Sequence, residues 1–207
     1  MKRTTSTIVG LLAAVCVAMG VGRVAAEEKK DWKPLMDGKT LAGWHPVGHG
    51  KWTVENGAFV GRANNEKLYG LLFSDQTFKD FTVRFKFKFT SGDSGFYIRT
   101  IFKEPDQAHE LQVKVGAPGS GVGRIYESYG RGWLVKPDKE AEKKIYKEKD
   151  WNEMTISAHG GHVIVKVNGE TTCELKDYKG RTVGHFALQM HAGTVNEVMF
   201  KDIEIAE

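Results

Sequence analysis

Residues 80–115 read DFTVRFKFKFTSGDSGFYIRTIFKEPDQAHELQVKV. From Phe81 to Phe89, every second residue is large and apolar, and the residues between them are polar. This period of two predicts a β-strand with one buried face. Because a row of large apolar side chains needs cover, the pattern also predicts a second layer packed against this sheet.

A turn over 91–95, rich in glycine and serine, is predicted to reverse the chain after this strand. Two strands follow, over 95–102 and 109–115. Alternation puts their polar side chains on one face and their apolar side chains on the other. We therefore expect a polar patch that carries Tyr97, Arg99, Glu110, Gln112 and Lys114.

A late strand over 183–191 follows the same alternation and adds Gln189 and His191 to the polar side. The opposite faces of these strands should pack between two sheets. A register error of one residue would exchange the two sets completely, so the prediction is sharp. The expected core residues are Phe96, Ile98, Leu111, Val113, Leu188 and Met190.

The remaining segments are also typical of an all-β protein. Asn56-Gly57 and Asn168-Gly169 predict tight two-residue hairpins. Segment 118–132, which contains Tyr126, is either a short strand in loops or a loop folded over a site. The charged segment 136–149 favours a solvated loop or one helical turn. The predicted fold is a two-sheet antiparallel jelly-roll sandwich of the concanavalin A-like type, with no helix of useful length.

Residues 1–26 have the features of a secretory signal peptide: a basic start, an apolar run over 8–21, and Val24-Ala25-Ala26 at the cleavage site. An uncleaved anchor and a lipoprotein at Cys16 are weaker alternatives. Cleavage would leave residues 27–207 as one jelly-roll domain, periplasmic or secreted. Because three basic residues would leave with the peptide, the net charge would fall from +4 to about +1. A charge this small gives no reason to expect a nucleic-acid partner, and no membrane partner is expected after cleavage.

Cys173 is then the only cysteine of the mature chain. A single cysteine excludes an internal disulfide and a zinc site built on a cysteine cluster. We expect Cys173 to be a small buried residue in a strand.

Five stretches resemble one known family: LMDGKTLAGWHPVGHGKWTVENGAFVG, LLFSDQTFKDFTVRFKFKFTSGDSGFYIR, HELQV, DWNEMTISAHGGHVIVKVNGE and GHFALQMHAGTVNEVMFKDIEI. Together they are similar to the 3-keto-disaccharide hydrolase family, formerly DUF1080. The resemblance implies a concanavalin A-like jelly roll, an extracytoplasmic location and action on glycosides whose sugar a partner oxidoreductase has oxidised at C3. Val115 and Met190 stand where the family usually has acidic residues.

The chemistry of a 3-keto sugar fits these side chains. Ordinary glycoside hydrolysis needs two carboxylates, and only Glu110 is a prominent candidate here. A ketone at C3 acidifies the hydrogen at C2, so one base and a cationic or donor group at the ketone oxygen suffice. We therefore expect Glu110 or His191 as the base and Arg99 as the group that polarises the ketone. The expected substrate-binding residues are Gln112, Gln189, Tyr97, Tyr126, Trp133 and Lys114.

Two alternatives stay open at this point. The same sandwich could be a non-catalytic carbohydrate-binding module, since jelly rolls host both functions, or more weakly a structural domain without a ligand. No cofactor is expected, although His109, His185 and His191 could bind a divalent ion together with Glu110. The sequence does not indicate the oligomeric state.

Overall fold

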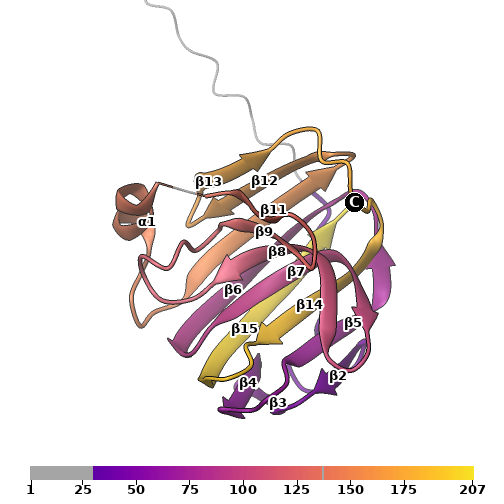
Figure 1. The fold of residues 1–207 in the computed structure, drawn as a ribbon, viewed down its shortest axis with the longest axis vertical. Helices are drawn as coiled ribbons and strands as arrows, with labels where there is room; N and C mark the ends of the chain where they lie inside the picture. The colour runs from indigo at the N-terminus through magenta and orange to yellow at the C-terminus, as the bar shows by residue number, and fades with distance from the viewer. Residues whose placement is uncertain (1–29, 137) are drawn as a thin grey trace, which may run out of the picture.

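The computed structural model describes residues 30–136 and 138–207, so the predicted signal peptide lies outside the described residues. The described chain folds into two antiparallel sheets that are stacked as layers, with one short helix at the side (Figure 1). This is the predicted two-sheet sandwich.

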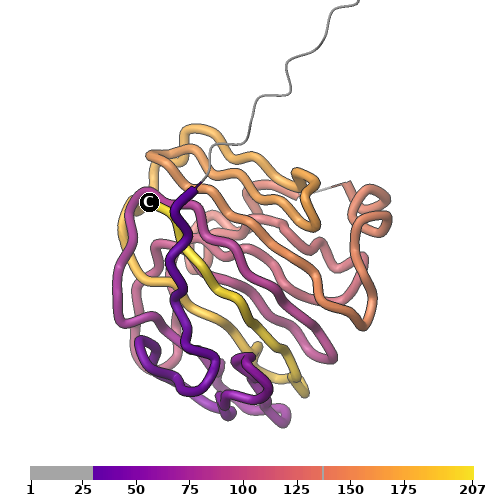
Figure 2. The backbone as a smooth tube through the Cα atoms, turned by 180° about the vertical axis from the view of Figure 1, so that it is seen from behind, coloured from indigo at the N-terminus to yellow at the C-terminus, as the bar shows by residue number. Residues whose placement is uncertain are grey.

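One sheet has eight strands in the order β13-β12-β11-β6-β15-β4-β3, with β1 paired to β15. Its strands are β1 (Lys33–Pro34), β3 (Lys51–Glu55), β4 (Ala58–Asn64), β6 (Phe81–Ser91), β11 (Asn152–His159), β12 (His162–Val167), β13 (Glu170–Leu175) and β15 (Val195–Ala206). Seen from behind, the N-terminal segment in indigo runs alongside β15 in yellow (Figure 2).

The other sheet has seven strands in the order β10-β9-β8-β7-β14-β5-β2. Its strands are β2 (Trp44–Gly48), β5 (Gly70–Phe78), β7 (Ser94–Lys103), β8 (Gln107–Val115), β9 (Ile125–Ser128), β10 (Gly132–Val135) and β14 (Gly184–Met190). The glycine-rich segment 118–132 therefore contains a short strand, β9, between loops.

The turn after β6 carries the chain from one sheet to the other, and β6 does not pair with β7. The two strands instead face each other through the core, where the rings of Phe85 and Phe96 stack at 4.3 Å. Both strands have an apolar face, and stacking buries the two faces against each other. The turn thus reverses the chain between layers rather than within one sheet.

The predicted core is confirmed. All six expected residues, Phe96, Ile98, Leu111, Val113, Leu188 and Met190, are buried in one hydrophobic cluster between the sheets. Both asparagine-glycine turns are also confirmed: Asn56 and Asn168 have φ of 50°, and the glycines that follow them have φ of 78° and 90°.

The charged segment forms more structure than expected. α1 (Lys139–Ile145) is capped at its N-terminus by Asp138, whose carboxylate accepts a hydrogen bond from the Ala141 amide at 2.8 Å. Glu142 lies buried in this helix and accepts hydrogen bonds from the amides of Gly119 and Val122, both at 3.0 Å. One carboxylate therefore docks the helix on the glycine-rich segment, a contact that a charge pattern alone does not indicate.

Cys173 is a free, buried cysteine in β13, as predicted. Burial raises the pKa of its thiol to about 11. In the described part of the chain, no helix is long and apolar enough to span a membrane.

Candidate functional site

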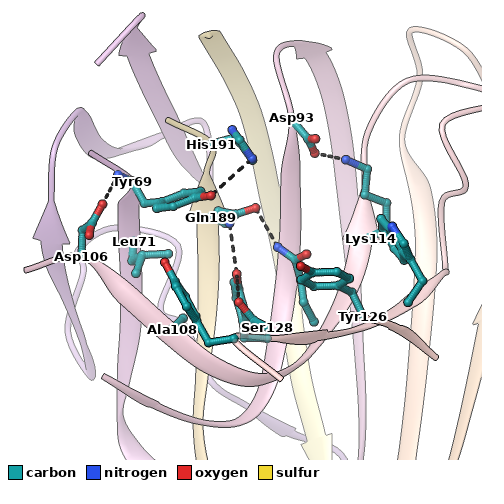
Figure 3. A pocket seen from close by; sticks show the side chains of 14 residues that line it. Tyr69, Leu71, Asp93, Asp106, Ala108, Lys114, Tyr126, Ser128, Gln189 and His191 are labelled. Carbon is teal, nitrogen blue, oxygen red and sulfur yellow. Dashed lines mark hydrogen bonds and ion pairs between the residues drawn. The ribbon is translucent and has the colours of Figure 1, made fainter. Parts of the chain in front are cut away.

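A pocket of about 380 Å³ opens on the face of the seven-stranded sheet that points away from the core. Part of its lining comes from simple alternation, because Tyr97, Gln112, Lys114 and Gln189 each lie between two core residues of the same strand. Its residues are Tyr69, Leu71, Asp93, Tyr97, Asp106, Ala108, Gln112, Lys114, Tyr126, Ser128, Tyr129, Trp133, Gln189 and His191 (Figure 3).

The floor of the pocket is a directed chain of hydrogen bonds. Gln112 Nε2 donates to Gln189 Oε1 at 2.7 Å, and Gln189 Nε2 donates to the Tyr97 hydroxyl at 3.1 Å. Tyr97 in turn lies 3.5 Å from the Ser128 hydroxyl. Burial raises the pKa of Tyr97, so its hydroxyl stays protonated and can donate a hydrogen bond in addition to the one it accepts from Gln189. The amides are thus held in fixed orientations in the floor of the pocket.

His191 follows β14 and lies at one side of this floor. Its Nδ1 is 2.7 Å from the carbonyl oxygen of Ala192, which can only accept a hydrogen bond, so Nδ1 carries the hydrogen. In the neutral ring the lone pair is then on Nε2, which lies 3.5 Å from the Tyr69 hydroxyl. Burial and the carboxylate of Asp106 raise the pKa of Tyr69. The side therefore offers one basic nitrogen beside one hydroxyl donor.

Lys114 and Asp93 form an ion pair at the opposite side of Gln189 (Figure 3). The Lys114 side chain is about nine-tenths buried. Burial and the nearby Arg124 lower the pKa of its ammonium to about 8, whereas the contacting carboxylate favours the charged form. A cation at this position can stabilise negative charge that develops on a bound ligand.

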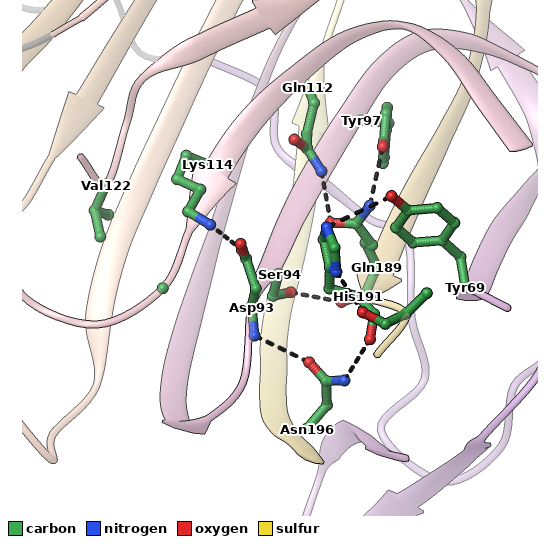
Figure 4. A network of polar contacts seen from close by, with 12 residues as sticks. Tyr69, Asp93, Ser94, Tyr97, Gln112, Lys114, Val122, Gln189, His191 and Asn196 are labelled. Atoms are coloured by element: carbon green, nitrogen blue, oxygen red, sulfur yellow. Dashed lines mark hydrogen bonds and ion pairs between the residues drawn. The ribbon is translucent and has the colours of Figure 1, made fainter. Parts of the chain in front are cut away.

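Asn196 fixes both sides of the pocket at once (Figure 4). Its side-chain oxygen accepts a hydrogen bond from the Asp93 amide at 3.0 Å, and its side-chain nitrogen donates to the His191 carbonyl at 2.7 Å. A backbone hydrogen bond of 3.1 Å from His191 to Asp93 completes the link. His191 and the anion of the ion pair are thus held by one buried amide.

The rim of the pocket is aromatic and lies on β9, β10 and the turn between them. Tyr126 and Trp133 are cross-strand partners whose rings are 4.8 Å apart. Tyr129 stacks on His109 at 4.4 Å. A polar floor beside an aromatic rim is typical of a carbohydrate site, since sugars have hydroxyl edges and apolar ring faces.

The structure brings seven of the nine predicted site residues together in this pocket: Tyr97, Gln112, Lys114, Tyr126, Trp133, Gln189 and His191. Arg99 and Glu110 do not line it. Both lie at a register shift between β7 and β8, where two residues of β7 face one residue of β8, and both have positive φ, 51° and 91°. This bulge turns their side chains away from the face that alternation assigns to them.

Arg99 is fully buried and points between the sheets. It donates to the carbonyl oxygens of Lys79, Gly160 and Ala158 at 2.8, 2.7 and 3.1 Å. The prediction that Arg99 faces the ligand is therefore wrong, and the guanidinium instead ties the seven-stranded sheet to the end of β11.

Glu110 also lies outside the pocket. Its carboxylate accepts a hydrogen bond from the Tyr178 hydroxyl at 2.7 Å and one from the Arg181 amide at 3.4 Å. The predicted shared face with Gln112 is thus wrong for Glu110. Of the two candidate bases, only His191 lies in the pocket.

Several pocket residues were missed by the sequence analysis. Tyr69, Asp93 and Asp106 lie at strand ends or in turns, and Ser128 lies at the end of β9. Asp93 lies in the turn SGDSG, where an aspartate is already explained as a turn residue, so the sequence does not indicate its contact with Lys114. Asn196 carried no signal, because its partners are far away in sequence.

The three histidines of the metal alternative, His109, His185 and His191, each contact a different group. His185 Nδ1 is 2.7 Å from the Ser74 carbonyl oxygen, and His109 Nε2 is 2.9 Å from the side-chain oxygen of Gln107. Within residues 30–136 and 138–207, no group of three or more His, Cys, Asp or Glu side chains is arranged to hold a metal ion. This arrangement does not support the metal alternative.

The departures from the family pattern leave the pocket intact. Val115 and Met190 both lie in the hydrophobic core. Neither substitution therefore removes a side chain from the pocket lining.

Solved structures with the same fold include sugar-binding and sugar-processing types. A candidate glycosyl hydrolase of Parabacteroides distasonis aligns with a TM-score of 0.62 at 19% identity, over 84% of this chain and 93% of that one. A carbohydrate-binding module, CBM66, of Bacillus subtilis aligns with a TM-score of 0.59 at 14% identity, over 80% and 96% of the two chains. At these identities the likeness shows the fold alone.

Sequence comparison gives the family. No curated protein sequence matches the chain. The family model described as a 3-keto-alpha-glucoside-1,2-lyase-like domain matches residues 31–206, which include every residue of the pocket. The chain therefore belongs to the 3-keto-alpha-glucoside-1,2-lyase-like family and is a carbohydrate-active domain of it.

Proposed function

We propose that this pocket cleaves 3-keto-glycosides by removing the proton at C2 and expelling the group at C1. The C2–H and C1–O bonds break, a double bond forms between C1 and C2, and the C3 ketone is retained. The proton lost from C2 reaches the departing oxygen, so the elimination needs no oxidant or reductant. Addition of water to the double bond makes the overall reaction a hydrolysis.

The placement of His191 in the pocket is the observation that carries this proposal. Its Nδ1 is engaged by the Ala192 carbonyl, so the lone pair is on Nε2, at the pocket, where the Tyr69 hydroxyl lies 3.5 Å away. A positioned imidazole is suited to proton abstraction near neutral pH. Its position is supported by the hydrogen bond from Asn196 to the His191 carbonyl.

Lys114 and the two glutamines supply the second requirement. As the proton leaves C2, negative charge develops on the C3 oxygen, and an ammonium group or amide N–H donors stabilise it. The Lys114 ammonium is buried beside Asp93, and the amides of Gln112 and Gln189 are fixed in the floor. We assign Lys114 to the charge and the glutamines to the orientation of the ring.

Carbohydrate binding without cleavage is the second candidate. The exposed aromatic side chains of the rim favour it, as does a fold shared with a carbohydrate-binding module. The polar floor with a basic nitrogen and a buried cation favours the enzyme, since a binding platform needs neither.

Incubation with a 3-keto-glucoside separates the two candidates. Wild type should release the aglycone, and His191→Ala should lower the rate by about 10²–10⁴-fold, the usual contribution of a general base. Glu110→Gln is the matched control and should stay within a few-fold of wild type, because Glu110 lies outside the pocket. Tight binding by wild type without any release of aglycone would favour the binding module.

A further inference from the structure

The exposed aromatic side chains of this protein gather at one place. Among the residues that the structure describes, the large aromatic side chains most open to solvent are Tyr129 and Trp133, at 53% and 41%. Both line the pocket described above. Contiguous exposed apolar surface that is rimmed by polar residues marks interaction sites such as ligand grooves.

Trp133 has the geometry of a stacking platform. The guanidinium carbon of Arg124 lies 4.7 Å from its ring centroid, and Tyr126 packs against it at 60°. The cation lies over the ring and Tyr126 packs against it at a tilt, while two-fifths of the residue stays open to solvent. The ring therefore presents open apolar surface whose orientation is set by two neighbours.

The hairpin that carries Trp133 is held rigidly. The carboxylate of Glu127 accepts hydrogen bonds from the Arg131 amide at 2.7 Å and from its guanidinium at 2.6 and 2.9 Å. The Tyr178 hydroxyl, whose one hydrogen is shared between Glu110 and Glu127, lies 3.0 Å from the same carboxylate. The turn between β9 and β10 is therefore fixed, so a ring that stacks on Trp133 meets a preorganised surface.

The aromatic platform and His191 lie on different strands of the sheet and line different parts of the same pocket. In the sheet order β10-β9-β8-β7-β14, four inter-strand steps separate β14, which ends beside His191, from β10, which carries Trp133. At 4.7–4.9 Å for each step, the two strands are about 19 Å apart along the sheet, so a ligand with two rings matches this spacing better than a ligand with one. Figure 3 shows the same order, with His191 and Tyr69 on one side of Gln189 and Tyr126 on the other.

We propose that Trp133, supported by Tyr126 and Arg124, forms a second subsite that stacks the leaving group of the glycoside. The ligand class is a ring with a flat apolar face, either a second pyranose or an aryl group. This inference rests on the proposed function for the identity of the leaving group. The stacking surface itself rests only on the geometry of the hairpin.

The test compares glycosides that share the 3-keto-glucosyl ring and differ in the leaving group: methyl, phenyl and glucosyl. Trp133→Ala should lower kcat/KM about tenfold for the phenyl and glucosyl compounds, as expected for the loss of an aromatic stacking partner, and less than twofold for the methyl compound. Trp133→Phe should restore most of the loss. Trp151→Ala is the matched control, because Trp151 also lies beneath a cation, Lys201 at 4.2 Å, but outside the pocket.

Titration calorimetry measures the binding of the same compounds, so the subsite can be tested even if the protein does not cleave them. If wild type cleaves none of them, the proposed function is wrong, and weaker binding of the phenyl or glucosyl compound to Trp133→Ala than to Trp151→Ala still supports the subsite. A loss for only one of the two identifies which ring the subsite takes. Equal losses for all three compounds, unchanged affinity in Trp133→Ala, or no binding to wild type would overturn the proposal.

Discussion

Arg99→Met should destabilise the protein strongly and leave the chemistry of each folded molecule nearly intact. In wild type, the fully buried guanidinium donates to the carbonyl oxygens of Lys79, Gly160 and Ala158 and contacts the carboxylate of Asp80. Methionine fills much of the same space, so the substitution mainly removes donors. The buried carbonyl of Ala158 then has no side-chain donor, and the tie between the two sheets is lost.

The magnitude follows from these contacts. A hydrogen bond from a charged donor contributes about 1.5–3 kcal/mol. A simple sum over three carbonyls overestimates the loss, because Lys79 and Gly160 are exposed residues whose carbonyl oxygens regain water. We expect the free energy of unfolding to fall by about 3–5 kcal/mol, the range found when a buried charged partner is removed.

Urea titration measures this loss, and release of aglycone below the unfolding transition measures activity per folded molecule. Arg84→Met is the matched control: Arg84 pairs with Glu204 on the partly exposed face of the eight-stranded sheet and should cost less than about 1 kcal/mol. Arg99→Lys keeps the charge, and the same two measurements are made on it if the methionine variant does not fold. Wild-type stability of Arg99→Met together with lost activity would refute this reasoning and return Arg99 to the catalytic role that alternation suggested.

Leu188→Ala should lower the free energy of unfolding by about 2–5 kcal/mol, because Leu188 is fully buried between the sheets, whereas the exposed Val183→Ala should change it by less than about 0.5 kcal/mol; urea titrations check both. Asn196→Ala should cost about 1–3 kcal/mol and slow aglycone release, because it frees the Asp93 amide and the His191 carbonyl; normal turnover would contradict the positioning role. Lys114 has a pKa of about 8 in the folded protein against 10.5 ordinarily, so between these values the unfolded chain binds more protons and this residue makes the free energy of unfolding rise with pH. Between pH 8 and 10, the free energy of unfolding of wild type should therefore increase relative to that of Lys114→Met. A difference between the two proteins that does not change with pH would contradict the shift.

Most of the fold could be predicted from the sequence because alternation and asparagine-glycine turns are local signals. Phe96 and Leu111 are buried as expected, and Gln112 faces the pocket as expected. The path of the chain between the sheets was harder to predict. Nothing local distinguishes a turn that pairs two strands from the turn after Ser91 that carries the chain to the other layer.

The site was predictable only where strands are regular. Gln112 and Gln189 lie on strand faces that alternation describes, and the structure brings them within 2.7 Å of each other. Arg99 and Glu110 sit at a bulge, where an extra residue changes the faces and the count fails. Asn196 could not be found at all, because its role depends on a contact between chain segments 103 residues apart.

The fate of the hydrogen at C2 tests the proposed chemistry most directly. A 3-keto-glucoside labelled with deuterium at C2 distinguishes elimination from direct hydrolysis, and NMR of the sugar product follows the label. Elimination followed by addition of water replaces the label with a solvent proton, whereas direct hydrolysis leaves the C2–D bond untouched.

We predict that wild type loses the C2 deuterium in step with aglycone release. Glu110→Gln should do the same, and His191→Ala should do neither at a comparable rate, since Nε2 of His191 is the basic nitrogen in the pocket. Release of the aglycone by wild type with full retention of deuterium at C2 would contradict the proposed elimination.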